Sequence, residues 1–204
     1  MPDESLIYLV DDDEAVRYGL RMLLEAAGYR VAEFGSAAEF LEACSDDQPG
    51  CLILDIQMPG TTGLELQEML VERGFGKPVI FLTGHASVPA AVKALKGGAI
   101  DFFQKPVTDE QPFLDRVAEA VEKDTANRRD AGRRAEAQAL AATLTPRERE
   151  VMELVSEGSA NKVVAIELGI SERTVELHRS HLMKKLGVRS IADLITLRNL
   201  LDDD

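Results

Sequence analysis

The sequence predicts an α/β domain with an open parallel sheet, followed by a small all-α domain. Up to residue 106, short apolar runs alternate with amphipathic segments, which is the pattern of βα units packed around a sheet. From residue 145 onward, helix caps and helix-ending glycines recur at short intervals. Between these regions, residues 124–142 hold almost no large apolar side chain. A chain of 204 residues is long enough for two small domains.

The first domain is predicted to contain five parallel strands. Strands of a parallel sheet are covered on both faces, so they appear as continuous apolar runs. The amphipathic segments between these runs, with glycines at several of their ends, are predicted as helices. Five alternating units indicate a doubly wound sheet. The strands are predicted at Leu6–Val10, Arg30–Phe34, Cys51–Leu54, Val79–Leu82 and Ile100–Phe103, and the helices at Ala15–Ala26, Ser36–Cys44, Gly63–Arg73 and Val88–Lys96.

A fifth amphipathic helix is predicted over residues 109–123. The segment after it, 124–142, is rich in Ala, Arg, Glu and Gln, and we expect a solvated helical linker, either continuous with the fifth helix or hinged. Its paired arginines at 128–129 and 133–134 are predicted to form a solvated face rather than a nucleic-acid patch. The predicted domains are therefore 1–123 and 143–204. The apolar stripe of the fifth helix comprises Phe113, Val117, Ala120 and Val121.

Four short helices with tight turns are predicted in the second domain. The first opens with a capping box, Thr145-Pro146-Arg147-Glu148, in which the proline occupies the first turn. Ser171 is predicted to cap the third helix, and Ser190–Asp193 forms a second capping box at the start of the last. The helices are predicted from Thr145 to about Glu157, at Asn161–Leu168, at Glu172–Leu186 and from Ser190 to Leu201.

The net charge of −13 argues against nucleic-acid binding, but this charge is unevenly distributed. Residues 1–144 carry 14 Lys and Arg against 25 Asp and Glu, whereas residues 145–198 carry 9 against 8. The second region is near neutral, which is compatible with DNA binding without requiring it. No apolar run approaches the length of a membrane span and no secretory signal is visible, so we expect a cytoplasmic protein without a membrane partner. Cys44 and Cys51 are expected to be reduced and buried.

Polar residues follow four of the predicted strands. Asp11–Asp13 follow the first strand, Asp55 the third, Thr83 the fourth and Lys105 the fifth. In an open α/β sheet, function collects at the carboxyl ends of the strands, and the strand order 2-1-3-4-5 would place these residues around one crevice. Clustered carboxylates repel one another unless a cation neutralises them, and a site of oxygen ligands suits Mg²⁺.

These residues limit the chemistry of the crevice. The set has no Cys/His nucleophile pair and no glycine-rich phosphate loop, which leaves phosphoryl transfer to a carboxylate. Asp55 would attack phosphorus, and Mg²⁺ would bridge the oxygens. Thr83 through its hydroxyl and Lys105 through its charge would hold the phosphoryl group in the product.

Several motifs in the first domain carry a family resemblance. Residues 5–122 resemble the receiver domain of bacterial response regulators, which implies the strand order 2-1-3-4-5 and makes Asp55 the phosphoacceptor. The motifs that carry the resemblance are Tyr8-Leu9-Val10-Asp11-Asp12-Asp13, Leu54-Asp55-Ile56-Gln57-Met58-Pro59-Gly60, Leu82-Thr83-Gly84-His85 and Gly98-Ala99-Ile100-Asp101-Phe102-Phe103-Gln104-Lys105-Pro106.

The resemblance also implies the ligands of the metal ion. Asp12 would bind Mg²⁺ directly and Asp11 through a water molecule. Asp55 and the backbone carbonyl of Gln57 would complete the ligands that the protein supplies.

A switch is implied in the same way. Thr83 and Phe102 would form the switch pair, in which the hydroxyl moves toward the phosphoryl group and the ring turns inward. A cis bond at Lys105-Pro106 would aim the lysine.

Structural alternatives exist for single residues of this set. Asp13 is expected to cap the first helix, because aspartate is favoured at that position. Phe102 could be an ordinary core residue at the end of a strand. His85 is expected to be a loop residue rather than a phosphate carrier. Asp11–Asp13 could simply cap the first helix, Asp55 could be a turn residue before Met58-Pro59-Gly60, and Lys105 could be a solvated surface lysine. Jointly, however, these three alternatives require four coincidences at one edge of the sheet.

The second and third helices of the all-α domain have the length pattern of a helix-turn-helix, with glycine at the turn. The second of these helices would lie in the major groove, with Val175, Leu182 and Leu186 on its buried side. Residues 144–200 resemble the LuxR-type DNA-binding domain, and the whole chain resembles FixJ/NarL-type regulators, with the FixJ transcriptional activators the nearer match. The motifs are Leu144-Thr145-Pro146-Arg147-Glu148-Arg149-Glu150-Val151, Glu157-Gly158-Ser159-Ala160-Asn161-Lys162 and Ile170-Ser171-Glu172-Arg173-Thr174-Val175-Glu176-Leu177-His178-Arg179.

The predicted DNA contacts lie on and before the recognition helix. Many relatives carry lysine at the position of Glu176 and often at that of Ser180, which moves the expected base contact toward Arg179. Alternatively, Arg173 and Arg179 are solvated charges that pair with nearby glutamates. The predicted contacts are Lys162, Arg173, Thr174, His178, Arg179 and Lys184.

The resemblance implies a two-component mechanism. A sensor histidine kinase phosphorylates Asp55, the receivers form a homodimer or release the effector domain, and the protein then binds promoter DNA and recruits RNA polymerase. The last helix, with Ile191, Leu194, Ile195 and Leu197, could serve dimerisation, although most of these residues are expected to pack the domain.

Two other classes of function remain open at this point. A phosphoaspartate hydrolase would need a general acid, which Asp13 or Glu14 could supply, but no cap domain is present. A module that binds protein through its all-α domain would fit the acidic total charge. We expect no metabolic enzyme, because the only chemistry predicted is phosphorylation and dephosphorylation of the protein's own aspartate.

Overall fold

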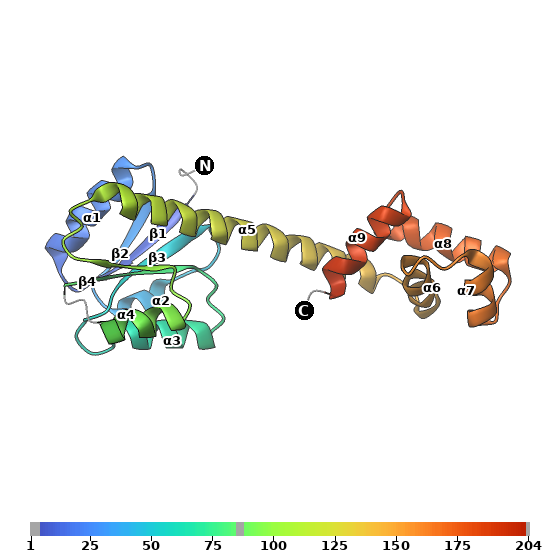
Figure 1. Cartoon of the computed structure of the whole chain (residues 1–204), viewed down its shortest axis with the longest axis horizontal. Coiled ribbons are helices and arrows are strands. Elements are labelled where there is room, and N and C mark those ends of the chain that lie inside the picture. Colours follow the sequence, from blue (N-terminus) through green and yellow to red (C-terminus); the bar gives the residue numbers. More distant parts are fainter. Residues whose placement is uncertain (1–4, 85–87, 203–204) are drawn as a thin grey trace. The chain divides into compact units, whose positions relative to one another are not determined.

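The computed structural model describes residues 5–84 and 88–202. Its five-stranded parallel sheet has the order β2-β1-β3-β4-β5, which confirms the predicted fold class (Figure 1). Every strand bound agrees with the prediction to within one residue, because each strand is an apolar run that ends at a polar residue or a turn. The strands are β1 (Leu6–Val10), β2 (Arg30–Phe34), β3 (Gly50–Asp55), β4 (Val79–Thr83) and β5 (Asp101–Gln104).

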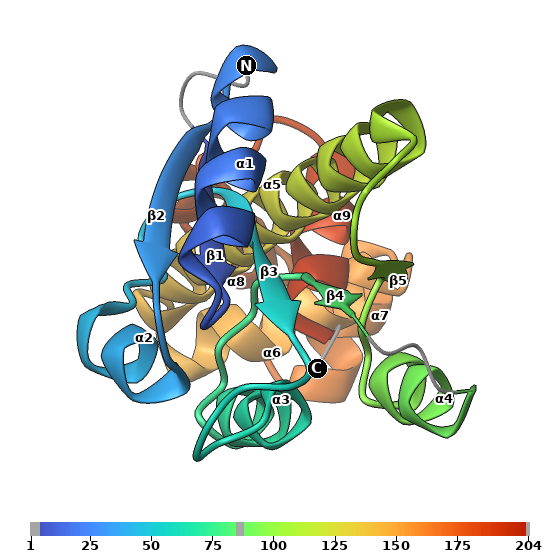
Figure 2. The same ribbon diagram turned by 90° about the vertical axis from the view of Figure 1, so that its left-hand side faces the viewer.

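Helices cover both faces of this sheet and enclose two hydrophobic cores. On one face, Phe40, Leu66 and Ala94 bring α2, α3 and α4 into the first core. On the other face, Leu24 and Phe113 bring α1 and α5 into the second core (Figures 1 and 2). The helices are α1 (Glu14–Ala26), α2 (Ala37–Ala43), α3 (Gly63–Glu72), α4 (Val88–Lys96) and α5 (Glu110–Ala142).

The pairing register aligns the carboxyl ends of the strands. Val10 of β1 pairs with Leu54 of β3, and Asp55 pairs with Leu82 of β4. The residues just after these pairs therefore lie at one edge of the sheet, as the sequence predicted. Cys51 is fully buried in the second core, and this burial raises the pKa of its thiol to about 12.

Helix α5 is longer than the predicted fifth helix, because it continues without a break to Ala142. It crosses the boundary between two compact units, Met1–Arg128 and Arg129–Asp204.

The prediction that residues 124–142 are solvated is wrong at both ends of that segment. Asp124 and Ala137 are almost fully buried. Arg128 ion-pairs with Asp124 and with Asp46, so it is not part of a solvated face. Asp124 also bonds to Gly50 and Arg128 to Asp46, and because these partners are distant in the sequence, local composition did not reveal the burial.

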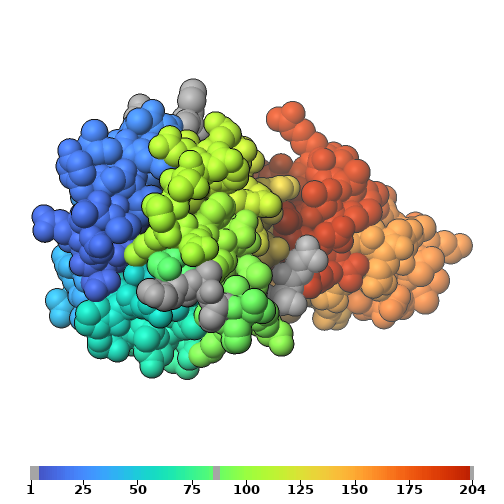
Figure 3. Space-filling view, turned by 60° about the vertical axis from the view of Figure 1, so that its left-hand side comes forward, coloured from blue at the N-terminus to red at the C-terminus, as the bar shows by residue number. Residues whose placement is uncertain are grey.

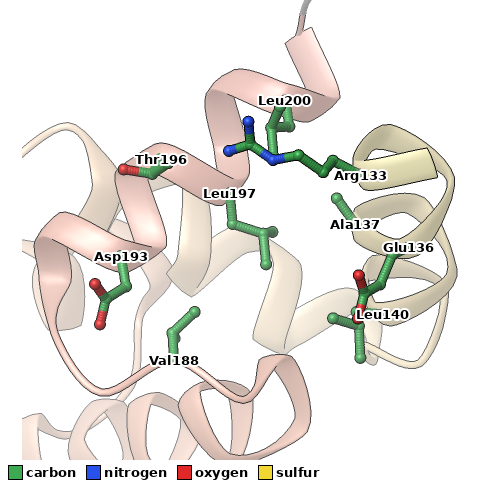
Figure 4. A pocket seen from close by; sticks show the side chains of 9 residues that line it. All are labelled: Arg133, Glu136, Ala137, Leu140, Val188, Asp193, Thr196, Leu197 and Leu200. Carbon is green, nitrogen blue, oxygen red and sulfur yellow. The ribbon is translucent and has the colours of Figure 1, made fainter. Parts of the chain in front are cut away.

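The second unit has a core of its own, built from α6 to α9. Thr145 forms the predicted capping box with Glu148, and Ser171 caps α8 as predicted. The last turns of α5 pack beside α9, where Ala137 and Leu140 line a pocket together with Leu197 (Figure 4). The helices are α6 (Pro146–Ser156), α7 (Asn161–Leu168), α8 (Glu172–Leu186) and α9 (Ile191–Asp202).

Candidate functional site

The predicted acidic residues converge at the carboxyl ends of β1 and β3. Asp11, Asp12 and Asp55 each offer a carboxylate oxygen, and these oxygens lie within 4.8 Å of one another. Asp11 and Asp55 are buried, whereas Asp12 is exposed. Buried carboxylates at this distance repel each other unless a cation lies among them.

Lys105 supplies a positive charge to this cluster. Its Nζ lies 2.7 Å from Oδ2 of Asp55 and also pairs with Oδ2 of Asp11. Burial alone would lower the pKa of Lys105, but the hydrogen bonds and charges of the two aspartates outweigh it and raise the pKa above its usual value. Burial also raises the pKa of Asp11, against the hydrogen bond from Lys105. One cation thus faces three carboxylates, which leaves the cluster net negative.

Local backbone geometry fixes the orientation of these carboxylates. The amide N–H of Gln57 donates to Oδ1 of Asp55 at 3.1 Å, and the amide N–H of Asp13 donates to Oδ1 of Asp11 at 3.0 Å. The side chain of Asp13 accepts from two backbone amides at the start of α1, so it caps that helix as predicted.

Gly63 is a structural position beside the cluster that the sequence analysis did not single out. A Cβ atom at Gly63 would lie 2.0 Å from the backbone oxygen of Asp55. Only glycine therefore lets the start of α3 approach the end of β3 this closely. A glycine at the first position of a predicted helix was the available signal.

The remaining residues of the predicted site lie on β4, on β5 and just beyond it. Thr83 is fully buried at the end of β4, and Phe102 of β5 is half-buried against the first core. The Lys105–Pro106 bond is cis, as expected. His85 lies outside the described residues.

The three carboxylates fit a magnesium site. Mg²⁺ prefers oxygen ligands and takes one or two carboxylates together with water and phosphate oxygens. Asp11, Asp12 and Asp55 supply such oxygens from two strand ends, and the net negative charge of the cluster favours a divalent cation.

The helix-turn-helix segment also agrees with the predicted arrangement. Gly169 ends α7 in the left-handed conformation, which glycine adopts without strain. Val175, Leu182 and Leu186 are buried and turn one side of α8 into the core.

The structure places the predicted DNA contacts in three different settings. Lys162, Arg173 and Lys184 are exposed. Thr174 is half-buried and its hydroxyl lies 2.7 Å from the Ser171 hydroxyl, so it belongs to the cap of α8. His178 and Arg179 are half-buried on the two flanks of the buried face of α8, and Arg179 donates a hydrogen bond to the side chain of Asn161.

Helix α9 divides its apolar residues between core and surface. Leu194 is fully buried and Leu197 is partly buried against the same core. Ile191 and Ile195 are exposed. Two of the four residues considered for dimerisation thus pack the domain itself.

Two family models match the chain. The model for the response regulator receiver domain matches residues 7–118. The model for the LuxR family of bacterial regulatory proteins matches residues 142–198. The matches fall on the segments that carry the acidic cluster and the helix-turn-helix.

Several curated relatives match over nearly the whole chain. Nodulation protein W of Bradyrhizobium diazoefficiens is 44% identical over 97% of this chain and 87% of its own length. Response regulator protein TodT of Pseudomonas putida is 42% identical over 98% of this chain and 87% of its own. Transcriptional regulatory protein FixJ of Azorhizobium caulinodans is 41% identical over 97% and 93%.

Solved structures give the same result. The response regulator StyR is 42% identical, with a TM-score of 0.87 over 96% of this chain and 98% of its own. Full-length FixJ from B. japonicum is 35% identical, with a TM-score of 0.58 over 97% of both chains. The chain therefore belongs to the two-component response regulators of transcription that join a receiver domain to a LuxR-type DNA-binding domain.

Proposed function

We propose that Asp55 accepts a phosphoryl group and that this event controls DNA binding by α8. The observation that carries the proposal is the meeting of Asp11, Asp12, Asp55 and Lys105 at one edge of the sheet. Thr83 ends the neighbouring strand, fully buried, which supports its role as the hydroxyl that contacts the bound group.

The transfer needs only groups that this cluster contains and an external donor. An oxygen of Asp55 attacks phosphorus, the bond between phosphorus and the donor breaks, and its electron pair leaves with the donor. Lys105 is 2.7 Å from Asp55 and neutralises charge on the phosphoryl oxygens of the product.

Magnesium is the proposed cofactor. Asp12 and Asp55 would hold it directly, Asp11 through water, and the backbone carbonyl of Gln57 would complete the set. When bound, Mg²⁺ supplies positive charge to the phosphoryl oxygens during transfer.

The proposed donor is a sensor histidine kinase. A groove of about 630 Å³ adjoins the cluster, and its lining includes Val16 and Leu20 of α1, Lys105, and Val107 of the β5–α5 loop. Helix α1 and the first turns of α5 lie side by side here (Figure 3). An apolar groove beside the acceptor gives a donor protein a surface on which to position its phosphoryl group.

The proposed response follows from the switch pair. Phosphorylation moves Thr83 and Phe102, which changes the face formed by α4, β5 and α5 and promotes homodimerisation, release of the effector unit, or both. The phosphorylated protein then binds promoter DNA and recruits RNA polymerase.

Such a protein acts in the cytoplasm and catalyses only its own phosphorylation and dephosphorylation. In the described part of the chain, no helix combines the length and apolar character needed to cross a membrane.

The test is phosphorylation of the full chain by a small-molecule phosphodonor with Mg²⁺, followed by sedimentation with and without palindromic DNA. We expect wild type to gain the mass of one phosphoryl group, to dimerise and to bind DNA more tightly. Asp55→Asn should do none of these.

Asp47→Asn, on a loop away from the sheet edge, is the matched control and should behave as wild type. Uptake of phosphate by Asp55→Asn would refute the acceptor. Uptake by wild type without a change in DNA affinity would refute the coupling.

A further inference from the structure

Arg17 of α1 contacts the backbone of the acidic cluster. Its guanidinium donates a hydrogen bond of 2.6 Å from Nη1 to the backbone oxygen of Asp11. Arg17 is half-buried near the start of α1, and long helical side chains point back toward the N-terminus of their helix, which here is the end of β1. The oxygen of Asp11 belongs to the peptide unit that joins Asp11 to Asp12. Arg17 therefore holds the peptide between two of the three clustered carboxylates.

Other hydrogen bonds fix the rest of Asp11. Its amide N–H donates to the backbone oxygen of Phe34 on β2 at 3.1 Å, and its carboxylate accepts from the amide N–H of Asp13. Asp12 differs, because its side chain is exposed. Burial does not hold the Asp12 carboxylate, so its position depends mainly on the backbone that carries it. The bond from Arg17 fixes that backbone at the peptide just before Asp12.

The charge of Arg17 and its hydrogen bond act on a bound cation in opposite directions. A positive charge near a cation site repels the cation. Glu39 offsets part of this charge: a Cβ at Gly35 would lie 3.5 Å from its Oε2 and 3.7 Å from Nη1 of Arg17, so both charges lie beside Gly35. If Arg17 promotes magnesium binding, it does so through the hydrogen bond to Asp11 and in spite of its charge.

We propose that Arg17 is a positioning residue of the magnesium site, which keeps the Asp12 carboxylate in place by holding the peptide between Asp11 and Asp12. Groups that hold metal ligands in orientation change metal affinity by about 10- to 100-fold when they are removed. The proposal rests on the proposed function, because it requires that the acidic cluster bind Mg²⁺.

The experiment measures Mg²⁺ binding to the full, unphosphorylated chain by isothermal titration calorimetry. Arg17→Gln removes the charge, and its side chain is too short to reach the Asp11 oxygen from the same backbone position. If Arg17 acted only through its charge, this variant would bind Mg²⁺ more tightly than wild type. We expect it to bind about tenfold more weakly instead.

Arg21→Gln is the matched control. Arg21 lies one turn further along α1 and is also half-buried, but it pairs with the side chain of Glu33 at 3.0 Å rather than with the cluster. Its Mg²⁺ affinity should stay within about twofold of wild type, because Glu33 is not one of the clustered carboxylates. Arg17→Lys keeps the charge and a donor on a shorter side chain, so it should lose less affinity than Arg17→Gln.

A second measurement separates positioning from a general loss of structure. In phosphorylation by a small-molecule donor, the Mg²⁺ concentration that gives half the maximal rate should rise in Arg17→Gln by the same factor as the dissociation constant. The rate at saturating Mg²⁺ should stay close to that of wild type. A damaged fold would lower the saturated rate as well. If Arg17→Gln does not fold, the comparison of Arg17→Lys with Arg21→Lys decides, and only the former should bind Mg²⁺ more weakly than wild type.

The outcomes separate this proposal from the function it rests on. If wild type binds Mg²⁺ and Arg17→Gln binds it as tightly or more tightly, the role of Arg17 is overturned while the magnesium site stands. Equal losses in Arg17→Gln and Arg21→Gln would overturn it too. If wild type itself binds no Mg²⁺, the proposed cofactor and the role of Arg17 are both overturned.

Discussion

Single buried charges in this chain have partners that make their burial tolerable. The carboxylate of Glu148 is almost fully buried, yet it accepts hydrogen bonds from Lys185 and from the backbone and hydroxyl of Thr145. The hydrogen bond from Lys185, and next the capping bond from Thr145, lower the pKa of Glu148 to about 2. A buried charge without such partners would destabilise the fold by several kcal/mol.

Glu148→Gln is expected to destabilise the second unit by about 2 kcal/mol at pH 7. Because the folded state lowers the pKa of Glu148, its contribution is complete above the unfolded value of 4.5 and is lost as the pH falls toward 2. The difference between wild type and variant should therefore shrink below pH 4.5. Urea unfolding followed by the NMR signals of α6 measures it.

The matched control for this prediction is Glu150→Gln. Glu150 lies on the same helix, but both it and its partner Arg147 are exposed, so the pair contributes less than about 1 kcal/mol. Equal effects of the two variants would contradict the role assigned to Glu148.

A second residue-scale prediction concerns Gln67 of α3. Its buried side-chain amide donates to the backbone oxygens of Ala94 and Gly97, so it satisfies carbonyl groups at the end of α4. Gln67→Met should cost about 2 kcal/mol through these lost bonds. Gln67→Glu should cost more, because it also places a buried negative charge against the same two carbonyl oxygens.

Tyrosine fluorescence during urea unfolding measures this effect, because all three tyrosines lie within residues 1–128. Glu68→Gln is the control, since Glu68 and its partner Lys93 are both exposed. If Gln67→Met and Gln67→Glu unfold at the wild-type urea concentration, the side chain is not what holds the end of α4.

At the scale of elements, the sequence predicted what local signals determine. Caps and glycines fixed the ends of α7 and α8, and apolar runs fixed the strands. The prediction that the second half of α5 is solvated failed, because the burial of Asp124 depends on Lys77 and Arg128. No local pattern connects Lys77 with a residue so far along the chain. The core of the candidate site was predictable, since four strand ends must meet at one edge of a parallel sheet. The bond from Arg17 to the backbone of Asp11 was not, because Arg17 resembles any solvated helix arginine until α1 and the end of β1 are placed.

The middle of α5 is held by a buried ion network, which gives an element-scale prediction. Asp124 accepts from the amide N–H of Gly50 at 2.9 Å and from Arg128 at 2.8 Å, and it lies 3.8 Å from the fully buried Nζ of Lys77. Burial lowers the pKa of Lys77, and Asp124 opposes that shift. Asp124→Ala should destabilise the first unit by about 3–5 kcal/mol, because it leaves a buried ammonium and a buried amide without this partner.

Thermal unfolding followed by tyrosine fluorescence measures this loss. Asp130→Ala is the control on the same helix, since Asp130 is exposed and its nitrogen–oxygen distance to Arg133 is 3.7 Å. We expect a change below about 0.5 kcal/mol for this control. A similar melting temperature for both variants would show that the network does not anchor α5.

At the scale of the whole molecule, the covalent connection between the units is one helix. The boundary between the units falls within α5, after Arg128, and Gly132 lies just beyond it. A Cβ at Gly132 would meet nothing within 4 Å, so alanine fits there, whereas proline would break the helical hydrogen bonds. Substitutions at Gly132 can therefore interrupt the helix without changing the number of residues that link the two units.

If phosphorylation acts on DNA binding through a continuous α5, Gly132→Pro should abolish the increase in DNA affinity that the phosphodonor produces. Asp55 should still be phosphorylated, since the acceptor site lies entirely in the first unit. Gly132→Ala should keep the full increase, because alanine favours the helix by about 1 kcal/mol over glycine. DNA titrations of both variants, with and without donor, give the answer. If Gly132→Pro shows the same phosphodonor-dependent increase in DNA affinity as wild type, the units communicate without a continuous helix. If both variants lose this increase, glycine itself is needed at position 132.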